Sequence, residues 1–155
     1  MEAAVAALHQ QLEHAGVPHA FGGAFALAYY GTPRPTSDID VNVFVQAQES
    51  EVRFEWEGTL VHFFFSCDPL HEEMERRVRE VPFGDGTIPI VTPEHLIIRK
   101  ALLDRTKDWV DIEQIFVATS PLDVQEMEGW MKQLAGVDDP RLAKLRSASG
   151  EFGPL

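Results

Sequence analysis

The sequence predicts an α+β fold, in which a small mixed sheet with flanking helices is followed by helices alone. Runs of alternating or continuous apolar residues, typical of strands, are confined to about residues 1–91. Helical spacing of apolar residues is the only pattern over about 92–147. The length of 155 residues suits one domain with a real core, so we expect both parts to belong to a single domain over 1–155.

In the sheet-containing part, the elements follow from two periodicities. Apolar residues three or four apart, such as Val5, Leu8 and Leu12, indicate a helix, whereas alternation indicates a half-exposed strand. The glycine-containing segment 83–86 joins two short extended stretches and predicts a hairpin turn. In chain order we expect a helix over 2–15, a strand over 18–21, a helix over 23–30, and strands over 39–45, 52–57 and 59–66.

Several helix starts are marked by an oxygen-bearing residue followed by proline. The side-chain oxygen accepts a hydrogen bond from the first helical turn, and proline suits the first helical position. The residues predicted to precede a helix in this way are Asp68, Thr92, Ser120 and Asp139.

The tail over 147–155 is small and polar, and we expect it to be frayed.

The most informative stretch runs from the glycine pair Gly22-Gly23 to Asp38-Ile39-Asp40, at the start of an apolar strand. Because side chains alternate along a strand, Asp38 and Asp40 share one face while Ile39 points into the core. Two such carboxylates repel each other unless a cation lies between them, and Mg²⁺ prefers oxygen ligands and phosphates. Glycine allows the backbone to approach a phosphate closely. The stretch therefore predicts a site for a metal ion and a phosphate group.

This order of residues resembles the nucleotidyltransferase superfamily, whose members have a polymerase beta-like fold. The resemblance implies that Asp38 and Asp40 are catalytic and hold Mg²⁺ or Mn²⁺ against a nucleoside triphosphate. It implies that Gly22 and Gly23 bind the nucleotide. The reaction would then be transfer of a nucleoside monophosphate by in-line displacement at the α-phosphate. The acceptor stays open and could be an RNA end, a protein or a small molecule.

The loop before the two aspartates carries three polar residues that fit the same pattern, Arg34, Thr36 and Ser37. The resemblance implies that they bind the nucleotide. An arginine can hold a phosphate through two hydrogen bonds, and a hydroxyl could orient the aspartates. The alternative for all three is ordinary loop chemistry.

A second run, over 93–117, resembles the downstream signature of the AbiEii-like nucleotidyltransferases, a branch known as toxins of toxin–antitoxin pairs. The matching residues are Lys100, Asp108 and Asp111. The resemblance implies that Lys100 and Asp108 bind the nucleotide and that Lys100 and Asp111 serve catalysis. From the residues alone, Lys100 could equally be a solvated helix charge paired with Asp104. Asp108 could equally be a carboxylate favoured by the helix dipole.

Asp108 and Asp111 are three residues apart, so we expect them to share one face of a helix. The residues Trp109, Ile112 and Phe116 supply an apolar stripe, which we expect on the opposite, core-facing side.

The strand over 60–65 departs from the superfamily pattern, in which a neighbouring strand commonly carries a third carboxylate. Its only polar residue is His62. A histidine can accept a proton from an incoming hydroxyl group, or it can be a core residue with no catalytic part. Glu55 or Glu57 would take the place of the carboxylate in another strand register. The alternative function is therefore a catalytically impaired nucleotide-binding or interaction protein of the same fold.

Composition excludes other classes of function. The net charge of −12, from 13 basic and 25 acidic residues, disfavours non-specific binding to nucleic acid. The expected partners are a nucleoside triphosphate and an antitoxin or helical partner chain. A single cysteine, Cys67, and the lack of an apolar run or signal peptide favour a cytoplasmic protein without a membrane partner. No zinc site is expected, because metal-ligand spacing is not evident among the remaining histidines, His9, His14, His19, His71 and His95.

Overall fold

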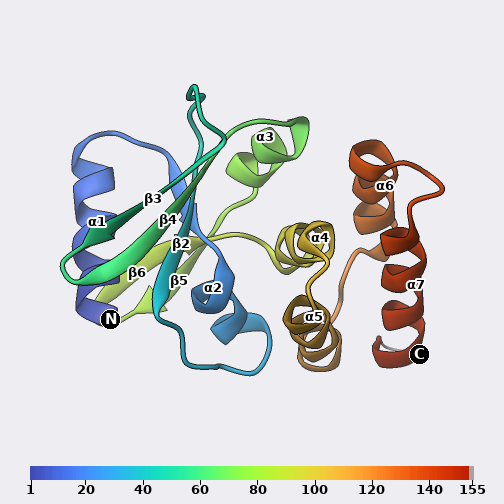
Figure 1. Cartoon of the computed structure of the whole chain (residues 1–155). Helices are drawn as coiled ribbons and strands as arrows, with labels where there is room; N and C mark the ends of the chain where they lie inside the picture. The colour runs from blue at the N-terminus through green and yellow to red at the C-terminus, as the bar shows by residue number, and fades with distance from the viewer. Residues whose placement is uncertain (154–155) are drawn as a thin grey trace. The chain divides into compact units, whose positions relative to one another are not determined.

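The computed structural model describes residues 1–153, which form two compact units. The first comprises residues 1–26 and 34–92 and contains the sheet, and the second comprises 27–33 and the helical residues from 93 onward. The predicted α+β class, with a mixed sheet followed by helices, is confirmed (Figure 1). The two units divide close to the predicted change from sheet to helices at about residues 91–92. That both parts belong to a single domain stays a prediction.

Among residues 1–153, the strands of the first unit are β1 (His19–Phe21), β2 (Asp38–Val43), β3 (Glu51–Trp56), β4 (Thr59–Phe65), β5 (Arg79–Phe83) and β6 (Gly86–Ile90). They form one mixed sheet in the order β3-β4-β2-β1-β6-β5 (Figure 1). Strand β2 runs parallel to β4 and antiparallel to β1, so it lies inside the sheet. The unit also contains helices α1 (Glu2–His14) and α3 (Pro69–Arg76) and the start of α2 (Gly23–Tyr30).

Alternation along β2 fixes which residues face the core. Ile39 and Val41 are fully buried, whereas Asp38 and Asp40 are partly exposed. Burial of an aliphatic side chain of this size contributes about 1.5–3 kcal/mol. A slip of one residue would expose both apolar side chains and bury both aspartates, so the hydrophobic pattern holds the aspartates on the accessible face.

The second unit contains α4 (Pro93–Leu103), α5 (Thr106–Ala118), α6 (Val124–Ala135) and α7 (Pro140–Phe152). Asp139 caps α7, since its carboxylate accepts hydrogen bonds from the backbone and the guanidinium of Arg141. The side-chain hydrogen bond from Arg141 is the main reason why the pKa of Asp139 is lowered to about 2. Arg141 also donates to the carbonyl of Leu102, which ties the start of α7 to the end of α4.

The proline rule predicts the starts of α3, α4 and α7 correctly, after Asp68, Thr92 and Asp139. The prediction of a helix start at Ser120 is wrong. Helix α6 begins at Val124, and its N-cap is Asp123, whose carboxylate accepts from the backbone N–H of Glu126 at 3.0 Å. A nearby carboxylate with the right backbone geometry supplies the cap there.

The prediction of a frayed tail is wrong for residues 147–152, because α7 continues to Phe152. Leu145 and Ala148 on this helix are buried, so packing within the unit extends the helix beyond the point that composition suggested. Residues 154 and 155, the last of that predicted tail, lie outside the described residues. Within residues 1–153, no helix has both the length and the apolar character needed to cross a bilayer.

Candidate active site

The two aspartates of β2 begin the strand on its accessible face. The Thr36 hydroxyl lies 2.9 Å from Oδ1 of Asp38 and donates to it, and its oxygen also accepts from the Asp38 backbone N–H at 3.3 Å. Thr36 therefore holds Asp38 in one orientation. Arg34 and Ser37 are exposed in the same loop.

The glycine pair packs directly against Asp40. The backbone N–H of Gly22 donates to the Asp40 carbonyl at 3.0 Å. Gly23 has a φ of +52°, and a Cβ at this position would lie only 2.2 Å from Oδ2 of Asp40. A Cβ at Gly22 would lie 3.0 Å from the side-chain nitrogen of Asn42, which is itself buried. The lack of side chains thus allows the start of α2 to lie against the Asp40 carboxylate.

Gly23→Ala is expected to weaken both the fold and the site. A left-handed backbone costs a non-glycine residue about 1–2 kcal/mol, and the new methyl group must displace the Asp40 carboxylate. Denaturant unfolding and metal-dependent binding of a nucleoside triphosphate would measure the two effects. Gly84→Ala is the matched control, because φ is +56° there and no described atom lies within 4 Å of the added Cβ. Equal nucleotide affinity in the two variants would contradict a site role for Gly23.

His62 is the register partner of Asp40 on the neighbouring strand β4. Its Nδ1 lies 3.8 Å from Oδ1 of Asp40, and its Nε2 lies 3.1 Å from Oε2 of Glu51 on β3. A carboxylate can only accept, so the geometry assigns the ring hydrogen to Nε2 as donor to Glu51. Nδ1 is the ring nitrogen on the Asp40 side. His62 is only 7% exposed, so the ring is held between the two carboxylates.

Glu51 was missed by the sequence reasoning, which named Glu55 and Glu57 as substitutes for the third carboxylate. Arg53 is the direct partner of His62 in the antiparallel β3–β4 pair, which places Glu51 on the same face. Glu57 lies outside β3, in the connecting turn, with a φ of 49°. The residues Glu57 and Gly58 form a two-residue turn, so the strand predicted over 52–57 ends one residue earlier, at Trp56.

Lys100, Asp108 and Asp111 form a buried ion cluster within the second unit. The Lys100 ammonium lies 2.8 Å from Oδ2 of Asp111 and 3.7 Å from Oδ1 of Asp108. The three residues are 5%, 0% and 5% exposed, in the order Lys100, Asp108, Asp111. Asp108 also accepts two hydrogen bonds from the guanidinium of Arg105, at 2.7 and 3.1 Å. Buried charges require such pairing, so the cluster is part of the core of this unit.

The alternative of Lys100 as a solvated charge paired with Asp104 is wrong, since Lys100 is buried against Asp111. The Asp104 carboxylate instead accepts from the indole of Trp109 and from Lys144. These two hydrogen bonds lower the pKa of Asp104, the one from Lys144 most strongly.

We expected the two aspartates to lie on the side of α5 opposite to its apolar residues, and this expectation is also wrong. Asp108 and Asp111 are buried on the same helix as Ile112, Ile115 and Phe116. Asp108 does lie in the first turn of α5, where its carboxylate accepts from the backbone N–H of Arg105 at 3.2 Å. Asp108 therefore both stabilises the start of α5 and belongs to the buried cluster.

The residues expected at the site fall into two groups, one in each unit. The first unit brings Gly22, Gly23, Asp38 and Asp40 together with His62, and the second contains the Lys100 cluster. The group of the first unit fits a hard divalent cation, because its donors are carboxylate oxygens on one strand face.

Comparison with solved structures gives a match in fold. An antigenic nucleotidyltransferase-like protein from Paracoccidioides brasiliensis aligns with a TM-score of 0.52 and 14% sequence identity, over 96% of this chain and 85% of that chain. No family model matches the sequence, and no curated protein matches it at a significant level. At this identity the likeness concerns the fold alone, so the chain has a nucleotidyltransferase-like fold.

Proposed function

We propose that the chain is a Mg²⁺-dependent nucleotidyltransferase that moves a nucleoside monophosphate from a nucleoside triphosphate to a hydroxyl or similar acceptor. The observation that carries the proposal is the packing of Gly23 against the Asp40 carboxylate, with Asp38 on the same strand face of a nucleotidyltransferase-like fold. An RNA end, a protein side chain and a small molecule are the acceptor classes.

Asp38 and Asp40 would hold the Mg²⁺ ion, which supplies positive charge to the phosphate oxygens when bound. Thr36 fixes the orientation of Asp38 by its hydrogen bond of 2.9 Å. Gly22 and Gly23 present backbone rather than side chains, so phosphate oxygens can approach closely. These residues bind and position the triphosphate.

His62 is the proposed base. Its Nδ1 would accept the proton of the acceptor hydroxyl while the acceptor oxygen bonds to the α-phosphorus. The bond from the α-phosphorus to the oxygen that bridges to the β-phosphate then breaks, and pyrophosphate leaves. Glu51 is a positioning residue, because its contact of 3.1 Å with Nε2 keeps Nδ1 as the accepting nitrogen.

The assignment to the AbiEii-like branch is supported by three residues of the second unit, Lys100, Asp108 and Asp111. We propose that they bind nucleotide through the Lys100 ammonium, which Asp111 holds at 2.8 Å. Their order along α4 and α5 is the basis for placing the chain near the AbiEii-like branch. In that case the partner would be a separate antitoxin chain.

A second candidate function is nucleotide binding without transfer. The observation that favours it is the histidine that pairs in register with Asp40, where the superfamily pattern described above commonly has a third carboxylate. In that case the chain binds a triphosphate and Mg²⁺ but leaves the phosphate bonds intact.

His62→Ala is expected to lower the rate of transfer by about 10²- to 10⁴-fold, the usual contribution of a general base. Binding of Mg²⁺ and nucleotide should be retained, because Asp38 and Asp40 are unchanged. His62→Asp should keep or raise activity, since it restores a carboxylate. Single-turnover rates and nucleotide affinity would separate the two effects, with Glu55→Gln, at an exposed position on the neighbouring edge strand β3, as the control. Full activity in His62→Ala would exclude the base role.

Incubation with each α-labelled nucleoside triphosphate and Mg²⁺ tests the proposed function. We expect pyrophosphate release and transfer of label to the protein itself, to tRNA or to a component of a cell extract. Nucleotide binding without pyrophosphate release from any of these mixtures would favour the second candidate. Neither binding nor release would overturn both.

A further inference from the structure

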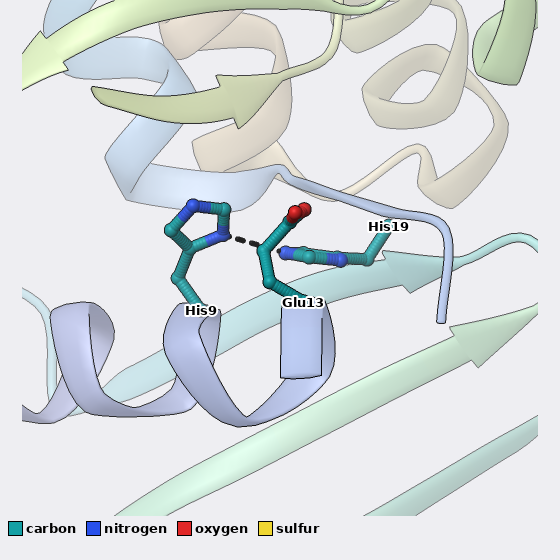
Figure 2. Close-up of side chains that lie close together, drawn as sticks. All are labelled: His9, Glu13 and His19. Carbon is teal, nitrogen blue, oxygen red and sulfur yellow. Dashed lines mark hydrogen bonds between the residues drawn. The ribbon is translucent and has the colours of Figure 1, made fainter. Parts of the chain in front are cut away.

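A cluster of two histidines and one glutamate lies in the first unit, apart from the residues assigned to nucleotide transfer. His9 and Glu13 are one turn apart on α1, and His19 lies on β1. One donor atom from each lies within 4.8 Å of the others. Figure 2 shows the side chains converging from the helix and the strand. Sequence spacing gave no sign of this cluster, because the turn after α1 brings His19 back to the helix.

His19 is already held in the form that a metal ion requires. Its Nδ1 lies 2.8 Å from the carbonyl of Val17 and donates to it, so its Nε2 carries the lone pair. A ring hydrogen bond to a backbone carbonyl is the usual support of a metal-bound histidine.

The second histidine faces this lone pair directly. Nδ1 of His9 lies 2.8 Å from Nε2 of His19 and donates to it in this structure (Figure 2). Two nitrogens on one tetrahedral zinc ion are roughly 3.3 Å apart, given bonds of about 2.0–2.1 Å. Replacing the shared proton by an ion therefore needs only a small outward movement of the rings. Glu13 is exposed and free to adjust its rotamer as the third ligand.

We propose that His9, Glu13 and His19 bind a divalent transition metal ion of the zinc class. Two imidazole nitrogens and one carboxylate oxygen suit such an ion and leave a fourth position for water. A hollow of about 390 Å³, lined by residues of α1 and of the β5–β6 hairpin, includes His9 but neither Glu13 nor His19. The ion would fasten α1 to β1, the strand that pairs with β2.

Equilibrium dialysis of the tag-free full chain against Zn²⁺ tests the proposal. Asp40→Asn and Cys67→Ser are introduced first, so that the β2 carboxylates and the donor group of Cys67, Asp68 and His71 do not hold the ion. We expect one bound ion per chain and at least about a tenfold loss of affinity in both His9→Gln and Glu13→Gln.

His14→Gln is the matched control, because His14 is exposed on the last turn of the same helix. It should bind Zn²⁺ as the background protein does. Glu13 is exposed, so Glu13→Gln keeps the test valid if His9→Gln folds poorly. No bound ion, or equal affinity in Glu13→Gln and His14→Gln, would overturn the proposal and leave a hydrogen-bonded histidine pair.

Discussion

Asp40→Asn is expected to abolish nucleotidyl transfer while the protein stays folded. The carboxylate would supply a metal ligand that is worth several kcal/mol in the transition state, so the rate should fall by at least about a hundredfold. Its neighbour Asp38 faces the same side of β2, and removal of one of two repelling charges should leave the free energy of unfolding unchanged or slightly higher.

Asp85→Asn is the matched control, because Asp85 is exposed in the turn between β5 and β6 of the same unit. Transfer rates and denaturant unfolding should be measured on both variants. Transfer at the wild-type rate in Asp40→Asn would refute the metal-ligand role. A loss of several kcal/mol of stability in that variant alone would show that the carboxylate is structural.

Lys100→Met is expected to destabilise the helical unit by about 3–5 kcal/mol, the usual effect of removing one partner of a buried ion pair. The variant leaves the buried carboxylates of Asp108 and Asp111 without the ammonium that lies 3.7 and 2.8 Å from them. Circular dichroism during guanidinium unfolding would measure the loss. Lys107→Met is the control, since Lys107 is exposed in the first turn of α5.

The triple variant Lys100→Met, Asp108→Asn and Asp111→Asn should recover part of that stability, because no buried charge is left unpaired. Equal stability of Lys100→Met and Lys107→Met would contradict the structural importance of the cluster. Nucleotide affinity of the folded Lys100→Met protein separates the two roles of this lysine. An unchanged affinity would assign Lys100 to the core alone.

The parts of the fold that depend on local chemistry could be predicted from the sequence. The alternation of Asp38, Ile39 and Asp40 determines both the faces of β2 and the place of the aspartates. Asp68 and Asp139 mark helix starts because a cap acts within one turn. Ser120 fits the same local rule but does not start a helix, because Asp123 provides the cap.

Features that depend on long-range packing could not be predicted in the same way. The burial of Asp108 and Asp111 follows from Lys100, which lies on another helix and compensates their charge. Without that partner, the hydrophobic pattern alone places carboxylates outside the core. The contact of Glu51 with His62 likewise depends on how β3 and β4 pair. Glu51 and Glu55 both lie on the face of His62, on either side of its direct partner Arg53, so their parity alone does not show which glutamate contacts the histidine.

Calorimetric titration with a non-hydrolysable nucleoside triphosphate tests the central claim most directly, that the β2 aspartates bind a metal–triphosphate complex beside the glycine pair. We expect that the wild-type chain binds only when Mg²⁺ is present, and that binding is lost in both Asp38→Asn and Asp40→Asn but not in Asp85→Asn. Equal binding with and without Mg²⁺, or undiminished binding by the two β2 variants, would contradict it.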